Sequence, residues 1–368
     1  MMNGNSGRRL LSALSALVPL VMVLESCAPA ATPASQANQP TATGDPVAAL
    51  YDKAKQEGSV VWYGQFSESQ ASGIIEAFTK KYPGVDVKFS DLKPTELMTQ
   101  VQVQERARNV QIDVAGVTDT NVPGLLDLGI IDDTIDWTKF GVSPDQFPVS
   151  RGLVQDFSLG DFIVYNTTKV SADEAPRTWD DLLLPRWKGR IAVDGRATFL
   201  DALYLDPGKG RDAGLAYASK LADQQPSYQA NLEQVLAAVV SGQFDLGTAV
   251  LSQVLFAQAS GKPVGIASVS PIYLTRHWLY LPKAAPHPAA AQLFTSWAVS
   301  QEGQAAMGTS YNAALPMKTT CPGNGLTVIK ALCDNHLEWY SPQTVEQLKD
   351  IADYETKARA IFGTGTGS

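Results

Sequence analysis

Polar side chains follow the predicted strands at the points where those strands end. Thr118 follows residues 112–117, and Arg196 follows residues 191–193. An arginine can hold a carboxylate or phosphonate through two parallel hydrogen bonds, and a helix start such as that predicted at Ser67 favours an anion. The sequence therefore predicts a site for a small anionic solute. The candidate ligand-binding residues are Tyr63, Gln65, Phe66, Ser67, Thr118, Asp119, Arg196, Thr198, Ser252, Gln253 and Tyr273.

Several candidates also have a purely structural interpretation. Asp119 and Ser252 are suitable helix N-caps, and Arg196 could pair with Asp194 or Asp201. Asp119 also favours an amine or a metal ion over an anion. The charge of the solute therefore stays open at this point.

The motifs of the common catalytic classes are missing. The sequence contains no Gly-x-Ser-x-Gly elbow, no His-Glu-x-x-His pair and no Gly-x-x-x-x-Gly-Lys-[Ser/Thr] loop. Its three histidines, His277, His287 and His336, match no metal-ligand spacing. We therefore expect a protein that is not an enzyme, with no catalytic residue, cofactor or metal site.

Alternating strands and helices must position the candidate side chains. Apolar patterns predict strands at 59–63, 85–90 and 112–117, with helices at 67–82 and 94–108 between them. This order implies a parallel sheet with helices on both faces. The pattern restarts in the second half of the chain, so we expect two α/β lobes with ligand beyond the carboxyl ends of their strands.

The N-terminal residues have the pattern of an export signal. Two arginines at positions 8 and 9 precede an apolar stretch at 10–24, which is too short to span a membrane and is typical of a signal peptide. Residues 24–27, with the sequence LESC, resemble a bacterial lipobox, so a lipid is expected on Cys27. The alternative is an ordinary leader cleaved near residues 28–31.

Composition and cysteine use agree with export. The formal net charge is −8, and the sequence has no lysine and arginine cluster that would indicate a nucleic-acid partner. Beyond Cys27, the remaining cysteines are Cys321 and Cys333. A lone close pair in an exported protein usually forms a disulfide. Two buried free thiols are the alternative.

Five stretches carry a resemblance to a known family. They are AKQEGSVVWYG at 54–64, IEAF with KYPG at 75–84, VYNT at 164–167, PRTWDDLL with PRWKGRIA at 176–192, and HPAAA with EGQ at 287–304. In this order they resemble the extracellular (periplasmic) solute-binding proteins of ABC importers, in the branch that includes ferric-iron-binding proteins. The resemblance extends over residues 48–362.

This resemblance implies a type II periplasmic-binding-protein fold, an α/β fold of two lobes joined by two hinge crossings, with ligand in the cleft between the lobes. The crossings would fall near residues 161–165 and 269–280. The implied organisation is a lipoprotein signal peptide at 1–26, a flexible tether at 27–47, first-lobe segments at 48–160 and 269–312, a second-lobe segment at 161–268, C-terminal helices on the second lobe at 313–362, and a disordered tail at 363–368.

The resemblance also implies a function. The chain would be a monomeric substrate-binding lipoprotein at the outer face of the cytoplasmic membrane, in the periplasm or at the cell surface. It would capture a small-molecule solute and deliver it to an ABC permease in the membrane. A ligand-sensing module for a receptor kinase is an alternative.

Iron is the alternative cargo. The iron-binding members hold the metal with two adjacent tyrosines, a histidine and an acidic residue. These positions match Leu251 and Ser252, Phe66, and Asp119 in this sequence. Only the acidic residue offers the anionic oxygen that ferric iron prefers, so the resemblance does not carry the iron site over, although an iron chelate stays open.

Overall fold

The computed structural model describes residues 44–92, 94–311 and 337–364. The predicted signal peptide, most of the tether, Cys27, Cys321 and Cys333 lie outside these ranges, as do the last four residues. Within them, every helix is too short or too polar to cross a membrane.

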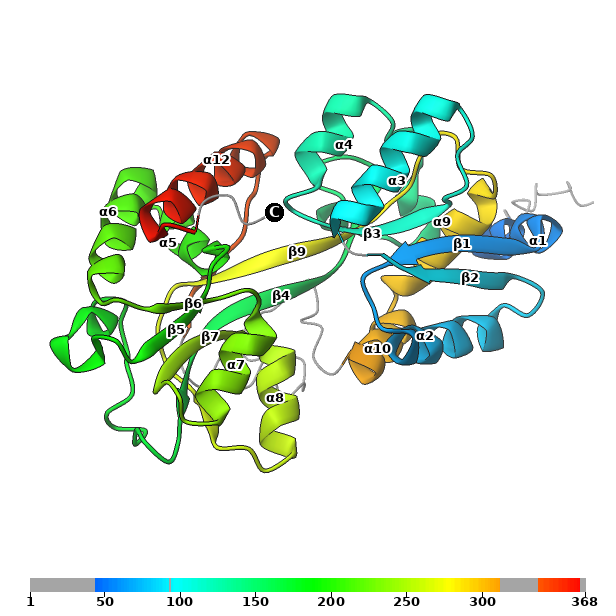
Figure 1. Cartoon of the computed structure of the whole chain (residues 1–368). Coiled ribbons are helices and arrows are strands. Elements are labelled where there is room, and N and C mark those ends of the chain that lie inside the picture. The colour runs from blue at the N-terminus through cyan, green and yellow to red at the C-terminus, as the bar shows by residue number, and fades with distance from the viewer. Residues whose placement is uncertain (1–43, 93, 312–336, 365–368) are drawn as a thin grey trace, which may run out of the picture. The chain divides into compact units, whose positions relative to one another are not determined.

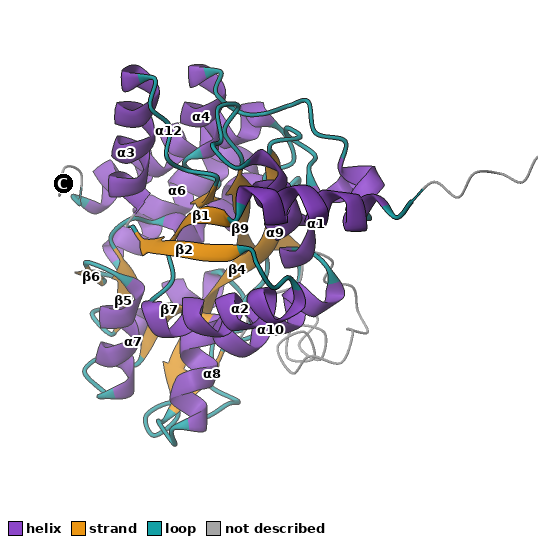
Figure 2. Ribbon diagram, turned by 90° about the vertical axis from the view of Figure 1, so that its right-hand side faces the viewer, coloured by secondary structure: helices purple, strands orange, loops and turns teal. Residues whose placement is uncertain are grey.

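The first lobe contains three parallel strands in the order β2–β1–β3. They are β1 (Ser59–Gly64), β2 (Asp86–Asp91) and β3 (Val114–Thr118). Figures 1 and 2 show helices on both faces of these strands. These helices are α1 (Pro46–Glu57), α2 (Glu68–Lys81), α3 (Pro94–Ala107), α4 (Val122–Leu128), α9 (Pro288–Ala298) and α10 (Gln301–Tyr311).

The second lobe repeats this plan. Its parallel strands run in the order β6–β5–β7, with β5 (Ile191–Asp194), β6 (Ser227–Gln229) and β7 (Leu246–Val250). The further elements are β8 (Val264–Ile266), α5 (Asp201–Leu205), α6 (Gly210–Asp223), α7 (Leu232–Val240), α8 (Leu251–Ala259) and α12 (Val345–Phe362). Short 3-10 helices lie at Trp137–Phe140, Pro144–Gln146, Asp180–Leu183, Pro185–Trp187 and Thr198–Leu200.

Two long antiparallel strands, β4 (Leu153–Asn166) and β9 (Ile272–Tyr280), join the lobes (Figure 1). The end of β9 pairs with β3 of the first lobe, and the end of β4 pairs with β7 of the second lobe. Because β4 and β9 also pair with each other, the two strands connect the sheets of the two lobes. The short strand β10 (Trp339–Tyr340) pairs with β9. The predicted parallel sheet is therefore found within each lobe. At the junction, where two hinge crossings were expected, β3, β9, β4 and β7 run antiparallel in turn.

Each lobe has its own aromatic core. In the first lobe the Phe294 ring lies 5.2 Å from Trp62 and 5.1 Å from Phe78. In the second, the Trp179 ring lies 5.6 Å from Tyr217, and Phe362 of α12 lies 5.1 Å from Tyr228. Burial of such side chains is the main favourable term in folding.

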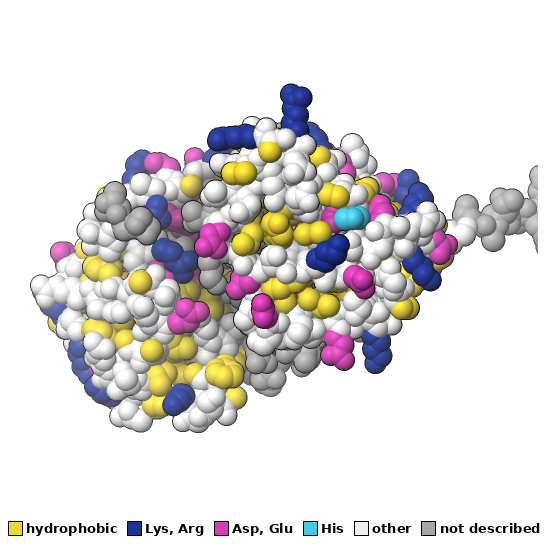
Figure 3. Space-filling view, turned by 45° about the vertical axis from the view of Figure 1, so that its right-hand side comes forward, with side chains coloured by type: hydrophobic (Ala, Val, Ile, Leu, Met, Phe, Trp, Pro, Cys, Tyr) yellow, Lys and Arg dark blue, Asp and Glu magenta, His cyan; other side chains and the backbone are white. Residues whose placement is uncertain are grey.

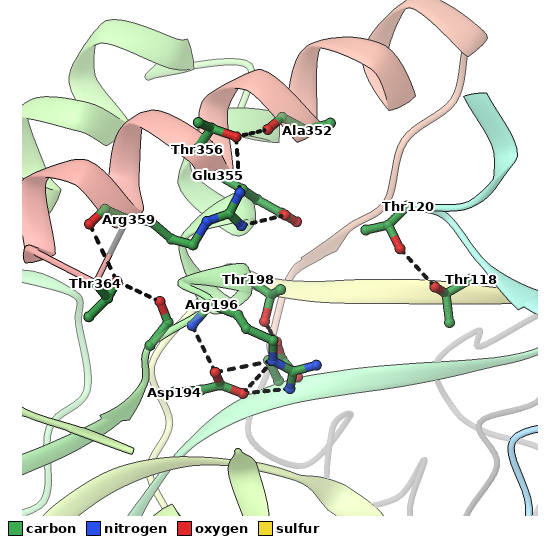
Figure 4. Close-up of polar contacts among 12 residues, drawn as sticks. Thr118, Thr120, Asp194, Arg196, Thr198, Ala352, Glu355, Thr356, Arg359 and Thr364 are labelled. Carbon is green, nitrogen blue, oxygen red and sulfur yellow. Dashed lines mark hydrogen bonds and ion pairs between the residues drawn. The ribbon is translucent and has the colours of Figure 1, made fainter. Parts of the chain in front are cut away.

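Helix α12 packs mainly on α5 and α6 of the second lobe. It also touches α4 of the first lobe, where the Lys349 ammonium lies 2.8 Å from an Asp127 carboxylate oxygen. Both side chains of that ion pair are exposed, so the pair adds little stability. The main consequence of this packing is that α12 brings Glu355 and Arg359 to the end of β5 (Figure 4).

Candidate functional site

The first-lobe candidates meet where β1 and β3 end. Because these strands are parallel, Gln65 reaches across and donates from Nε2 to the Gly116 carbonyl at 3.3 Å. The hydroxyls of Thr118 and Thr120 lie 3.0 Å apart (Figure 4), and Asn121 accepts from the Thr118 amide. Thr118 is half-buried and Thr120 is exposed, so this edge presents hydroxyl groups.

Three other first-lobe candidates have structural roles. Phe66 is buried in the core, with its ring 5.3 Å from Trp62. Tyr63 is half-buried and packs on a neighbouring apolar cluster. Ser67 is the N-cap of α2: its amide donates to Gln70 Oε1, and its hydroxyl accepts from the Gln70 amide. The Ser67 amide that was expected to attract an anion is therefore already bonded.

Asp119 fastens β9 to the end of β3. Its Oδ2 accepts from the Arg276 amide at 2.8 Å, and its Oδ1 accepts from Trp278 Nε1 at 2.9 Å and Arg276 Nε at 3.2 Å. Burial raises the pKa of Asp119, and the Arg276 charge opposes that rise. Asp119 does not cap α4, whose N-cap residue is Asn121. Both oxygens of its carboxylate accept hydrogen bonds from residues of β9.

Tyr273 is also buried. It lies opposite Asp161 in the β4–β9 ladder and is 2% exposed. Burial raises the pKa of its hydroxyl well above the usual value. In this structure Tyr273 is a packing residue of the second lobe.

Arg196 is held along one edge by Asp194, the last residue of β5 (Figure 4). Its Nε lies 2.9 Å and 3.1 Å from the two carboxylate oxygens, its Nη2 contacts one of them, and its amide donates to Oδ1. Asp194 is fully buried, whereas the Arg196 side chain is 57% exposed. The pairing considered from the sequence is thus present, and it leaves Nη1 without a hydrogen-bond partner in the part of the chain that the structure describes.

Asp161 and Thr198 meet beside this arginine. The Thr198 hydroxyl donates to Asp161 Oδ2 at 2.9 Å. Asp161 is 8% exposed, and burial raises its pKa to about 6, although Thr198 and the Arg196 charge act in the opposite direction. This carboxyl is charged at neutral pH in a poorly solvated place.

Two further carboxyls, Asp201 and Glu355, lie close enough to Asp161 to interact with it electrostatically. Both are buried, and Arg359 Nη1 lies 3.4 Å from Glu355 Oε2. Burial and the neighbouring Glu355 charge raise the pKa of Asp201 well above its usual value.

Ser252 and Gln253 lie in the first turn of α8. Ser252 is inside the helix, whose N-cap residue is Val250, so it is not the N-cap considered from the sequence. Val250 lies opposite Asp161 in the β4–β7 ladder, which places the start of α8 beside Asp161. Gln253, in contrast, lines a 380 Å³ apolar depression between α7 and α8, together with the exposed Phe256.

The structure thus divides the candidates. It brings Arg196 and Thr198 together at one edge of the second lobe, and Gln65 and Thr118 at one edge of the first. The sequence analysis did not include Asp161 or Glu355 among the candidate ligand-binding residues. Asp161 was expected only as the start of the crossing at 161–165, and Glu355 lies far from it in the sequence, so only the packing of α12 reveals this neighbourhood.

Metal ligands do not gather in the described ranges: no group of three or more histidine, cysteine, aspartate or glutamate side chains could hold an ion there. At the positions that match the family's iron ligands, Leu251 and Phe66 are buried apolar residues. On the face drawn in Figure 3, acidic and basic side chains are interspersed and form no large patch of one sign.

Comparison with known proteins gives the family. The family model of the bacterial extracellular solute-binding protein matches residues 73–327. The Fe(3+)-binding periplasmic protein of Serratia marcescens is 27% identical over 197 residues, which is 53% of this chain and 57% of that protein. The chain thus spans little more than half the length of this curated relative.

Two solved structures show the same fold. Iron-bound HitA from Pseudomonas aeruginosa has a TM-score of 0.66 at 19% identity, covering 82% of this chain and 99% of that one. An ABC transporter substrate-binding protein from Bradyrhizobium japonicum has a TM-score of 0.69 at 16% identity, covering 83% and 99%. Both resemblances and the crossing strands β4 and β9 agree with the predicted type II periplasmic-binding-protein fold. The chain belongs to the bacterial extracellular solute-binding proteins, a family of binding proteins and not of enzymes, as its sequence resemblance predicted.

Proposed function

We propose that this chain captures a small organic solute for an ABC importer, that a lipid on Cys27 holds it at the outer face of the cytoplasmic membrane, and that Arg196 binds an anionic group of the solute. The observation that carries the proposal is the orientation of Arg196 by the buried Asp194. Family membership supports the binding role, and the B. japonicum neighbour is named as part of an ABC transporter.

Asp194 prepares Arg196 for a ligand. Because the carboxylate fixes Nε and Nη2, the guanidinium is immobilised before any solute arrives, and its other edge stays open. Such preorganisation lowers the entropy lost on binding. The hydroxyls of Thr118 and Thr120 on the first lobe can supply further donors when hinge closure brings the lobes onto the solute.

Replacing Arg196 by glutamine is expected to weaken solute binding about 100-fold. Arg196 is half-exposed here, but closure of the lobes on the solute would bury the pair that it forms with the anionic group, and loss of one partner of a buried charge pair typically costs about 2–5 kcal/mol. Isothermal titration with a panel of carboxylates and phosphonates measures the change. Arg177→Gln is the matched control, since Arg177 is an exposed second-lobe arginine that forms an ion pair with Asp173, which is also exposed. Heat only with cationic solutes, or equal affinities for the two variants, would contradict the role given to Arg196.

Ferric iron is not the cargo that we propose. The S. marcescens relative is named for it, but the matching positions here carry Leu251, Ser252 and Phe66. None of these side chains is an anionic oxygen ligand, and ferric iron is a hard cation that requires such ligands. An organic solute fits the arginine and hydroxyl groups better.

Replacing Cys27 by alanine is expected to release the protein from the membrane fraction of growing cells. One thioether-linked lipid group is the only anchor in the proposal, and lipid chains supply the membrane affinity. Fractionation and immunoblotting, with Ser26→Ala as a control that leaves the cysteine in place, measure the distribution. A Cys27→Ala protein that stays in the membrane fraction would refute the anchor and leave the solute-binding role intact.

A further inference from the structure

We propose that Asp161 binds a positively charged group of the solute, so that the cargo is a zwitterion whose anionic group lies on Arg196 and whose ammonium group lies on Asp161. The inference rests on the proposed function, because it assigns the second charge of the same solute. It narrows the expected cargo from an anion to a molecule of the amino-acid type.

The surroundings of Asp161 leave one carboxylate oxygen without a partner. Thr198 donates to Oδ2, and the Asp161 side chain has no other hydrogen bond or ion pair among the described residues. The side chain is nevertheless more than nine-tenths buried. A buried charge without a cation is costly, so an ammonium group from outside the chain would find a strong partner in Oδ1.

The cations near Asp161 are already engaged. Arg196 donates hydrogen bonds from Nε and Nη2 to Asp194, and Arg359 donates one from Nη1 to Glu355. Even when Asp201 is left out of the count, the carboxylates of Asp161, Asp194 and Glu355 outnumber these two arginines by one. A solute with only negative charge would add to that excess, whereas the ammonium group of a zwitterion would balance it.

The position of Asp161 suits contact with a solute. It lies on β4 where this strand leaves β9 and joins β7, facing Val250 at the start of α8. Through Thr198 it is tied to the loop that carries Arg196. That loop is fixed in turn by Thr364, whose hydroxyl donates to the Gly195 carbonyl at 2.9 Å, although residue 364 was assigned to a disordered tail from the sequence.

The test compares Asp161→Asn with the unaltered protein against three forms of each probe. The probes are the 20 common amino acids and 4-aminobutyrate, each offered as the free zwitterion, the N-acetyl derivative and the carboxamide. Asparagine keeps an oxygen for the Thr198 hydroxyl, so the variant should fold. Asp223→Asn is the matched control, because Asp223 is exposed at the end of α6.

We expect at least one zwitterion to bind, and its affinity to fall about 100-fold in Asp161→Asn but not in Asp223→Asn. N-acetylation should weaken binding to the unaltered protein by a similar factor. The N-acetyl derivative should then bind the unaltered protein and Asp161→Asn with nearly the same affinity. If carboxylates without an amine bind equally well to both proteins, Asp161 does not receive a cation and the importer role stands. If no probe in any form binds and no solute is carried through purification, the zwitterion inference and the proposed function both fall.

Discussion

Replacing Asp119 by alanine is expected to lower the free energy of unfolding by about 3–5 kcal/mol. The Asp119 carboxylate receives the Arg276 amide, Arg276 Nε and Trp278 Nε1, all within 3.2 Å. Without it the guanidinium of Arg276 stays buried and charged, since arginine does not release its proton in proteins. Urea unfolding followed by tryptophan fluorescence measures the change.

A double variant separates the ion pair from the cavity left by the alanine. In Asp119→Ala with Arg276→Met, the unpaired buried charge is gone, so much of the lost stability should return. The two residues join β3 to β9, which is one of the two strands between the lobes. A single variant within about 1 kcal/mol of the unaltered protein, a typical effect of an unremarkable substitution, would show that Asp119 does not fasten the junction.

Replacing Asp161 by asparagine is expected to stabilise the solute-free protein at pH 7.5 by about 2–3 kcal/mol. Burial raises the pKa of Asp161 from the usual 3.8 to about 6, and a pKa difference of one between the folded and unfolded states corresponds to about 1.4 kcal/mol. Between pH 3.8 and 6 the folded state binds more protons than the unfolded state, so stability falls as pH rises through this window. Asparagine cannot ionise and removes that loss.

The gain should therefore depend on pH. At about pH 4 the carboxyl of Asp161 is mostly protonated in the folded protein, so the two proteins should unfold at nearly the same temperature. Differential scanning calorimetry of both proteins at pH 4 and pH 7.5 measures the difference, with Asp223→Asn as the control. A variant that is less stable than the unaltered protein at pH 7.5 would contradict the claim that the buried charge of Asp161 destabilises the folded protein. A residue that lowers stability while supporting binding is common at functional sites.

Apolar patterns predicted the elements of the first lobe well but missed part of the junction. The strand expected at 59–63 is β1, and the helix expected at 67–82 is α2. The first half of β4 was missed because it contains buried polar residues that break the pattern. Asp156 Oδ1 lies 2.7 Å from His277 Nδ1, and Gln155 donates to Ser158 at 2.9 Å. Tertiary partners satisfy these side chains, and a single sequence does not show such partners.

The sequence predicted the positions of candidate site residues only where they directly follow a strand. Arg196 and Thr198 follow β5, and the sequence placed both correctly after that strand. The sequence did not show whether Asp119 binds solute or stabilises the fold, because its partner Arg276 lies 157 residues away. The neighbourhood of Asp161 needed Glu355, which α12 carries from the end of the chain. Local patterns do not encode contacts of that range.

Native mass spectrometry of the protein, purified from its producing cells without denaturation, tests the central claim most directly. The account predicts one small organic molecule per chain, with a mass and fragmentation that show both an amine and an acidic group. It also predicts that Arg196→Gln and Asp161→Asn each lose this molecule, while Arg177→Gln and Asp223→Asn keep it. Bound iron in place of an organic solute, or the same occupancy in all four variants, would contradict the account.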